Sequence, residues 1–536
     1  MRRIDSTIMT GTDSFRRNAA HNRALAEELR QRQHAARVER PQRDLDRLAR
    51  QSKLTIRERL NLLLDPGTPF LELSTLAANR AYGGDVPGAG QLTGIGIVAG
   101  REVLVRADDS SVKGGAWYPL SVKKIVRALD IAIENRLPVI HLCDSAGGFL
   151  PMQAEFFPDR QHAGRIFRNQ AMLSKMGVPQ VAVVLGHCTA GGAYIPALSD
   201  YSVIVRGSGA IFLGGPPLVK AATGEEVSVE ELGGADMHTS VSGVADYPAA
   251  SEAHGIALAR EVIGTLSPPC KTAIDTVDPE PPHYDPDELY GILPADPRTA
   301  FDMREVIARM VDGSRFHEYQ PAYGPTLICG FARIWGMKVG ILANNGVLFS
   351  DSALKGTHFI TLCDKDRTPL VFLQNITGFM VGREYERQGI TKDGAKMIMA
   401  VTGASVPKFT VNANASFGAG TYGMAGRAFD SRLLFSWPQS QVGVMGAEQA
   451  AQVLTEVKLR QLEREGRTLS AEEIAAIRDP VLREYAETAS AWHATSQLWD
   501  DGLLDPVDTR NALAIGLSAA LNAPIETPPH YGVFRL

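Results

Sequence analysis

Short apolar runs that begin at a proline recur along the chain and alternate with longer stretches of mixed polarity. Such runs follow Pro138, Pro179, Pro369 and Pro407. An apolar run of this kind, bounded by turn residues, is typical of a buried strand. The stretches that precede two of these runs, 120–135 and 160–176, are expected to be helical. Strands that alternate with helices predict βαβ units and a largely parallel sheet.

The same order of features occurs twice along the chain. Residues 94–109 and 330–345 each predict a strand, a tight glycine turn and a second strand. In each half a proline-led run then ends in a polar and glycine turn, and a further run leads to a second glycine turn, at Gly192 or at Gly420. Three ordered matches with nearly constant separation indicate an internal duplication.

A proline-rich segment separates the two halves. Residues 267–297 contain two Pro-Pro pairs, which disfavour helix. We therefore expect an α/β fold with an N-terminal arm over 1–60, a first domain over 61–270 and a second domain over 271–536. The arm is rich in arginine but also carries acidic residues, which favours an amphipathic helix over a transit peptide.

The composition narrows the class of protein. The chain has 536 residues, 44% of them apolar and 21% charged, and a formal net charge of −5. These values exclude a disordered chain and argue against a general nucleic-acid binder. The five cysteines form no C-x-x-C pair, so we expect five buried, reduced thiols and neither a zinc ribbon nor a disulfide framework. No metal-ligand spacing occurs, and the uncharged stretch 176–199 holds too many glycines and prolines for a membrane span.

The glycine turns are the strongest candidates for chemistry. A glycine turn between a strand and a helix presents unpaired backbone N–H groups, which suit a phosphate or the oxyanion of a thioester enolate. The structural alternative is that these glycines only permit tight turns and close packing.

Other motifs fit less well. Residues 418–423 match G-x-G-x-x-G late in their domain, no P-loop occurs, Ser145 lacks the G-x-S-x-G context, and Cys188 is expected to pack against the sheet.

Six further segments resemble one protein family: 157–167, 188–194, 212–225, 375–382, 393–396 and 531–535. They are similar to the carboxyltransferase (β) subunits of biotin-dependent acyl-CoA carboxylases, and most of all to the methylcrotonyl-CoA and geranyl-CoA carboxylase branch. The similarity covers nearly the whole chain. It implies two tandem crotonase-like (ClpP/crotonase) domains behind an N-terminal helical arm.

The resemblance also implies a reaction. The family moves a carboxyl group from carboxybiotin to an acyl-CoA and stabilises one oxyanion on each substrate. The acceptor implied here is 3-methylcrotonyl-CoA, with geranyl-CoA or another acyl-CoA as the alternative. Two other classes stay open, a biotin-independent crotonase-type hydratase or isomerase and an assembly protein with a degenerate site.

Roles for individual residues follow from the same resemblance. Gly191 and Gly192 correspond to the hole for the thioester oxygen, and Ala419 and Gly420 to the hole that faces biotin. The residues implied at the pocket rims are Ala146, Gly147, Gly148, Thr377 and Gly378. The acyl-CoA-binding stretch of the family corresponds to 316–345, which begins at Phe316 and ends at Asn345.

The family works with partners, and the resemblance implies them here. Biotin would be carried as carboxybiotin by an α subunit that combines biotin carboxylase and biotin carrier, and that subunit would use ATP and bicarbonate. The chain would form a homo-oligomer, a β hexamer in an α6β6 assembly, with neither nucleic acid nor membrane as partner. The expected compartment is the bacterial cytoplasm, with the mitochondrial matrix as the alternative.

Overall fold

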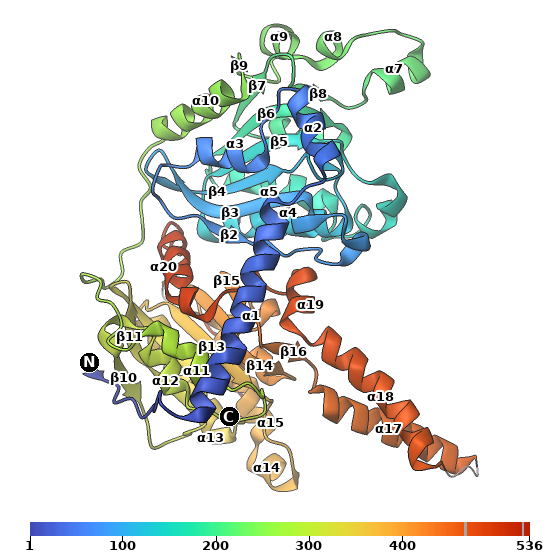
Figure 1. Cartoon of the computed structure of the whole chain (residues 1–536). Coiled ribbons are helices and arrows are strands. Elements are labelled where there is room, and N and C mark those ends of the chain that lie inside the picture. The colour runs from blue at the N-terminus through green and yellow to red at the C-terminus, as the bar shows by residue number, and fades with distance from the viewer. Residues whose placement is uncertain (466–468, 528–529, 536) are drawn as a thin grey trace.

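Two sheets of the same design carry the fold (Figure 1). The computed structural model describes residues 1–465, 469–527 and 530–535. The first sheet has the order β2-β3-β4-β5-β6-β7-β9, and β8 pairs with β6. The β3–β4 hairpin is antiparallel, and β4 to β7 are parallel. The strands are β2 (Leu71–Leu73), β3 (Gln91–Val98), β4 (Arg101–Asp108), β5 (Val139–Ser145), β6 (Gln180–Thr189), β7 (Tyr201–Val205), β8 (Ala210–Phe212) and β9 (Tyr247–Ala249).

The second sheet repeats this arrangement. Its order is β1-β10-β11-β12-β13-β14-β15, and β16 pairs with β14. Even the irregularity in register near the end of β5 recurs near the end of β13, so the internal duplication is confirmed. The strands are β1 (Arg2–Arg3), β10 (Arg315–Tyr319), β11 (Leu327–Ile334), β12 (Met337–Asn344), β13 (Leu370–Ile376), β14 (Lys408–Phe417), β15 (Leu433–Ser436) and β16 (Gln441–Gly443).

The N-terminal arm lies across both halves (Figure 1). It contains α1 (Asp13–Val38), α2 (Gln42–Arg50) and α3 (Ile56–Leu63), so the expected helical arm is confirmed. It begins with β1, which pairs antiparallel with β10 of the second sheet. Further along, Asn22 Nδ2 lies 2.9 Å from the carbonyl of Tyr290 and 2.7 Å from that of Leu293. The arm therefore packs on the body of the protein and is not a solvated extension.

Helices cover both faces of each sheet. In the first half, α3 and α10 (Glu252–Thr265) cover one face, and α4 (Pro119–Asn135) and α5 (Ala163–Lys175) cover the other. Both α4 and α5 confirm helices that the sequence predicts. In the second half, α13 (Ser350–Lys365) and α15 (Ile390–Gly403) face α12 (Met303–Ala308) and α20 (Thr509–Ala520) across the sheet. Shorter helices are α9 (Ala235–Met237), α11 (Leu289–Ile292), α14 (Arg383–Gln388) and α19 (Ala491–Ser496).

One hydrophobic core joins the two halves. It runs from Leu104 and Leu129 in the first half to Phe409 and Leu513 in the second. Helices α4 and α20 contact each other within it. The chain crosses between the halves through the proline-rich segment, in which 267–285 contains neither helix nor strand.

Two helical protrusions leave the body at opposite ends of the molecule (Figure 1). Helices α17 (Ala447–Arg464) and α18 (Ala471–Thr488) pack side by side as a hairpin in the second half. Helices α7 (Pro216–Thr223) and α8 (Val229–Gly233) lie in the protrusion of the first half. The protrusion of the first half follows β8, the short strand that pairs with β6, and that of the second half follows β16, the short strand that pairs with β14. The two protrusions therefore occupy equivalent positions in the duplication.

Four of the five cysteines are buried, as expected, but Cys270 is exposed. It follows Pro268 and Pro269 in the crossing segment, which forms neither helix nor strand at this point. That prediction was therefore wrong for this residue. Within the described part of the chain no helix is long and apolar enough to cross a bilayer, and no cluster of potential ligands could hold a metal ion.

Candidate functional site

Each half places two glycine turns at the same edge of its sheet, because parallel strands end together. In the first half β6 runs into a 3₁₀ turn at Ala190–Ala193 and then α6 (Tyr194–Ala197). In the second half β14 runs through Gly418 into α16 (Gly420–Gly423). Ala190 and Gly418 both adopt a left-handed conformation, with φ of 52° and 63°. The two turns are therefore equivalent in conformation as well as in position.

These turns present unpaired backbone donors. The N–H groups of Gly191 and Gly192 form no hydrogen bond with any described residue, because they open a short helix that has no earlier turn to bond to. The same holds for the N–H groups of Ala419 and Gly420 among the residues described. Each half thus offers a pair of donors to an oxygen from outside the chain.

The structure brings the predicted rim residues to these donors. A Cβ on Gly147 would lie 3.2 Å from the carbonyl oxygen of Thr189, just before the first donor turn. A Cβ on Gly420 would lie 3.1 Å from the Cα of Gly378. Ala146, Gly148 and Thr377 belong to the same two rim turns, which follow β5 and β13.

A backbone clamp fixes the rim turn in each half. In the first half, Trp117 N–H donates to Gly147 O at 2.9 Å, and Phe149 N–H donates to Trp117 O at 2.9 Å. In the second, Leu348 N–H donates to Gly378 O at 3.2 Å, and Met380 N–H donates to Leu348 O at 2.8 Å. The clamp residues follow β4 and β12, so three successive strand ends build each site.

A buried ionic network supports the turns of the first half. Asp108 accepts hydrogen bonds from the Trp117 indole at 2.8 Å, from Arg106 and from the backbone N–H of Asp144. Asp144 in turn pairs with Lys53 at 2.7 Å and with Arg59 at 3.0 Å. Burial raises the pKa of Asp144, but the charges of Arg59 and Lys53 lower it by more than burial raises it. The pKa of Asp144 therefore lies below its usual value. The carboxylate is therefore ionised and fully engaged.

The second half uses neutral groups at the equivalent positions. Asn344 Oδ1 accepts from the backbone N–H of Asn375 at 3.2 Å, as Asp108 accepts from Asp144. Asn414 Nδ2 then donates to Asn375 Oδ1 at 2.9 Å. The matching position in the first half is Gly186, where a Cβ would lie only 1.8 Å from Asp144 Oδ1. Sequence reasoning missed these residues, although aligning the two halves pairs Asp108 with Asn344 and Asp144 with Asn375.

A cavity of 520 Å³ opens beside the donor turn of the first half. Ala146, Thr189, Lys53 and His187 are among the residues that line it. Burial and the nearby charge of Lys53 lower the pKa of His187. Ser145 Oγ donates to Gly115 O at 2.8 Å and accepts from Gly147 N–H, so it serves the turn and has no histidine partner in the described chain.

Two predicted residues lie elsewhere. Phe316 lies in β10, is 6% exposed and packs over Gly330 in the shared core. Asn345 follows β12, and its Oδ1 accepts from the backbone N–H of Met303 at 3.0 Å. The structure brings neither of them into contact with the donor turns. Cys188 is buried beneath the first turn, as expected for a packing thiol, and a hydrogen bond to Cys143 together with burial raises its pKa.

Comparisons with known proteins show the family to which the chain belongs. A family model described as the carboxyl transferase domain matches residues 48–532. The β1 subunit of a biotin-dependent 3-methylcrotonyl-coenzyme A carboxylase from Mycobacterium tuberculosis is 52% identical over 97% of this chain and 98% of its own length. A probable mitochondrial methylcrotonoyl-CoA carboxylase β chain from Drosophila melanogaster is 51% identical over 99% of this chain and 95% of its own length.

A solved structure supports the same family through its fold. The β subunit of geranyl-CoA carboxylase from P. aeruginosa matches 99% of both chains with a TM-score of 0.88 and 40% identity. The expected crotonase-like fold of two tandem domains is confirmed. The chain belongs to the carboxyl transferase family and is similar throughout its length to the β subunits of biotin-dependent carboxylases.

Proposed function

We propose that this chain is the carboxyltransferase subunit of a biotin-dependent acyl-CoA carboxylase and that its acceptor is 3-methylcrotonyl-CoA. The observation that carries the proposal is the pair of matched donor turns, one in each half, whose amides are unpaired in the described chain. The 52% and 51% identity to methylcrotonyl-CoA carboxylase β chains supports the acyl group.

In the first half, the donor turn holds the thioester oxygen. When a proton leaves the carbon that will be carboxylated, negative charge moves onto this oxygen. The amides of Gly191 and Gly192 stabilise that charge, and a preorganised donor of this kind contributes about 3 kcal/mol. The clamp from Trp117 and the charges around Asp144 keep the neighbouring turn rigid, so the donors need no reorganisation during the reaction.

In the second half, the amides of Ala419 and Gly420 hold the carbonyl oxygen of the biotin ring. Bound carboxybiotin supplies the carboxyl group and the base. The neutral Asn344, Asn375 and Asn414 beneath this turn fit that role, because they add no fixed charge beside an oxygen that becomes negative. The four donors thus divide into an acyl-CoA set and a biotin set.

The side chains around the first turn argue for this reaction over hydration. A hydratase needs a carboxylate free to donate and accept protons beside the oxyanion hole. Among the described residues that line the cavity, the only carboxylate is Asp144, and Lys53 and Arg59 engage both of its oxygens. The chain therefore leaves the proton transfer to its biotin substrate.

We extend the proposal to the partners. A biotinylated α subunit would supply carboxybiotin from ATP and bicarbonate, and the chain would assemble as a β hexamer with it. Biotin is attached to the lysine of an Ala-Met-Lys-Met motif in this family of enzymes, and the Met337-Lys338 pair here lies in Gly-Met-Lys-Val. Lys338 belongs to β12 and pairs with Asp366 at 2.5 Å, so we assign it to the strand and not to biotin attachment. The bacterial cytoplasm stays the predicted compartment.

Carboxyl transfer to free biotin tests the proposal with this chain alone. The purified protein should move the carboxyl group of 3-methylglutaconyl-CoA to biotin, and with a biotinylated α subunit it should carboxylate 3-methylcrotonyl-CoA with a higher kcat/KM than geranyl-CoA. A higher kcat/KM for geranyl-CoA would select the alternative acceptor, which the solved relative also suggests. Hydration of a 2-enoyl-CoA without any carboxyl transfer would refute the proposal.

A further inference from the structure

Three aromatic rings connect the rim turn of the first half to a segment of the chain outside the donor site. Phe149, which follows the rim turn, stacks on Tyr118 with ring centroids 4.5 Å apart and an angle of 14° between the rings. Tyr118 also contacts Tyr82, whose ring centroid lies 4.9 Å away. Phe149 belongs to the backbone clamp, so the aromatic stack of these three rings is tied to the rim turn through the clamp.

The second half has no equivalent of this stack among its described residues. Aligning the two halves pairs Tyr118 with Phe349 and Phe149 with Met380. The ring of Phe349 contacts that of Tyr385 in α14, with centroids 5.7 Å apart, and Met380 has no ring. The aromatic stack therefore belongs to the first donor site alone.

Tyr82 lies in the segment between β2 and β3, which we call the strap (residues 74–90). Five residues of the strap other than glycine adopt the left-handed conformation, with φ between 51° and 65°: Ser74, Ala78, Arg80, Tyr82 and Ala89. Such conformations are strained, and they persist only where the surrounding structure holds them. The strap therefore depends on contacts with other elements for its shape.

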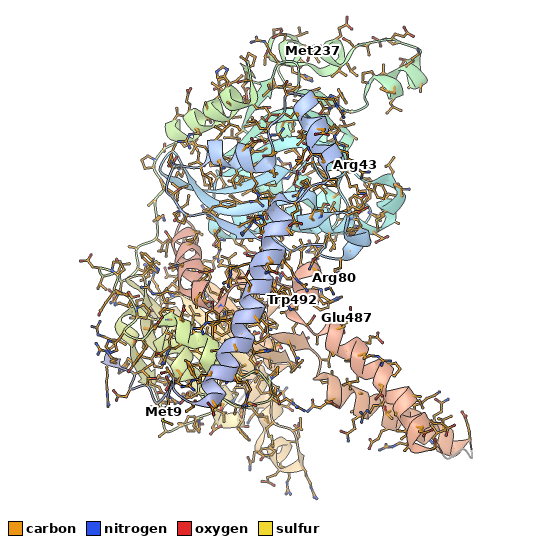
Figure 2. The ribbon with its side chains drawn as sticks, viewed as in Figure 1. Met9, Arg43, Arg80, Met237, Glu487 and Trp492 are labelled. Carbon is orange, nitrogen blue, oxygen red and sulfur yellow. The ribbon has the colours of Figure 1, made fainter. Side chains whose placement is uncertain are left out.

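The second half supplies part of those contacts. Ala78 N–H donates to the carbonyl of Ser496, the last residue of α19, at 2.9 Å. Leu498, just after α19, packs in one buried cluster with Ala78. Figure 2 shows Arg80 of the strap and Trp492 of α19 at the junction of the two halves. The position of α19 thus helps to set the position of the strap.

The rim turn in turn supports the donor amides. A Cβ on Gly147 would lie 3.2 Å from the carbonyl oxygen of Thr189, which directly precedes the donor turn. A Cβ on Gly192 would lie 3.9 Å from Ser145, which directly precedes the rim turn. A displaced rim turn would therefore displace the donors, and a misplacement of about 1 Å can lower a rate about 100-fold.

We propose that Tyr82 is a positioning residue for the donor turn of the first half. Its ring holds Tyr118, and Tyr118 holds the ring of Phe149 beside the rim turn. The rim turn then keeps the geometry in which the donor amides stabilise the thioester oxygen. The proposal rests on the proposed function, because the exact position of these amides affects the rate only if an oxyanion forms beside them. Tyr82 acts through the aromatic stack and not through contact with the substrate.

Replacing the ring of Tyr82 tests the inference. Tyr82→Asn removes the ring and keeps the strap, because asparagine adopts the left-handed conformation more readily than most residues. The kcat for carboxyl transfer from 3-methylglutaconyl-CoA to free biotin should fall about tenfold. The KM for the acyl-CoA, and the Kd for CoA from titration calorimetry, should stay within about twofold of the wild type.

Two further changes separate positioning from a general loss of structure. Tyr82→Phe keeps the ring and should restore kcat to within about twofold of the wild type. Tyr323→Asn is the matched control, because Tyr323 is 44% exposed and lies in the corresponding connection of the second half, between β10 and β11. It should leave kcat unchanged. Tyr82→His has a smaller ring and should give an intermediate kcat, which tests the inference should Tyr82→Asn not fold.

A double-mutant cycle tests whether Tyr82 acts through the stack. Phe149→Leu should lower kcat, and adding Tyr82→Asn to it should lower kcat by less than about twofold more. Effects of the two changes that multiply in full would overturn the inference. A Tyr82→Asn protein with unchanged kcat and a raised Kd for CoA would also overturn it, because Tyr82 would then contact the substrate.

The inference and the proposed function fail in different ways. A wild-type protein that transfers carboxyl groups, together with a Tyr82→Asn variant of equal kcat, would overturn the inference and leave the function intact. A wild-type protein that transfers no carboxyl group would overturn the proposed function and the inference with it.

Discussion

The two glycines at the centre of the donor turns are glycines for different physical reasons. A Cβ on Gly192 would meet nothing closer than Ser145 at 3.9 Å, so the protein itself has room for a side chain there. A Cβ on Gly420 would lie 2.5 Å from Ile376, so packing alone requires glycine at this position. Free space beside an unpaired amide marks Gly192 as a place that a ligand approaches.

This difference makes Gly192→Val an informative variant. The substitution should leave the melting temperature within about 2 °C of the wild type, because no protein atom obstructs Cβ, and should lower kcat for acyl-CoA carboxylation about 100-fold or more. Steady-state kinetics and a thermal melt measure the two effects. Gly420→Ala should do the reverse and lower the melting temperature by several degrees. A Gly192→Val enzyme with wild-type kcat would remove this turn from the reaction.

Removing one amide tests the second donor turn without adding bulk to the packed glycine. Ala419 has φ of −66° and its N–H is unpaired within the described chain, so proline fits the backbone at this position. Ala419→Pro should lower the rate of carboxyl transfer to free biotin about 100-fold and leave the Kd for CoA unchanged. The same change at Ala425, shortly after α16, would not be a comparable test, because its φ of +52° lies outside the range that the proline ring allows. Weaker CoA binding in Ala419→Pro would contradict the division of the two turns.

At the scale of elements, the sequence pattern predicts the strands and turns that are determined by residues close together in the chain. The prolines, apolar runs and glycine turns mark β5, β6, β13 and β14, and the two donor turns follow from them. What the pattern leaves out depends on contacts distant in sequence. Arg2 and Arg3 have no strand pattern and form β1 only because β10 offers a free edge. Asp108 and Asp144 look like surface acids until Arg106, Lys53 and Arg59 surround them.

Phe316 illustrates the limit of a family resemblance. The resemblance places it in an acyl-CoA-binding stretch, but its strand, β10, lies two strands away from β12 in the sheet order and its ring fills the core over Gly330. A range transferred as a whole carries buried residues along with exposed ones. Burial, which a single sequence does not specify, separates the two.

The arm gives a prediction at this scale. Asn22 Nδ2 is directed at two buried carbonyls, those of Tyr290 and Leu293, and Asn22→Ala would leave them unpaired. The free energy of unfolding should fall by about 1–3 kcal/mol in a denaturant titration. His21→Ala, at the exposed neighbouring position, should change it by less than about 0.5 kcal/mol. Equal effects of the two variants would show that the arm is not anchored through this amide.

At the scale of the molecule, one carboxylate ties the two halves together. Asp501 is fully buried, and it pairs with Arg127 of α4 in the first half at 2.9 Å and with Arg427 in the second at 2.8 Å. Its backbone also bridges the halves: its carbonyl accepts from Ser74 N–H, and its N–H donates to Leu434 O, both at 2.7 Å. Relative orientation of the two sheets therefore depends on this residue as well as on the shared core.

The pH dependence of this tie gives the last prediction. Burial raises the pKa of Asp501, but Arg127 and Arg427 lower it more, so it lies well below the unfolded value of about 3.9. A carboxyl pKa lowered by folding contributes stability that is complete above the unfolded pKa and is lost as the pH falls through the folded pKa. Asp501→Asn removes the charge that pairs with Arg127, which keeps only Glu134 at 3.3 Å, and with the partly exposed Arg427, and it should cost about 3–5 kcal/mol between pH 5 and 8. The difference in unfolding free energy between the wild type and Asp501→Asn should then narrow below about pH 4.

Denaturant midpoints of both proteins from pH 8 to pH 3 measure this difference, and Asp13→Asn, at an exposed position, is the control. A difference that is small at pH 7, or that stays constant down to pH 3, would contradict the role of Asp501.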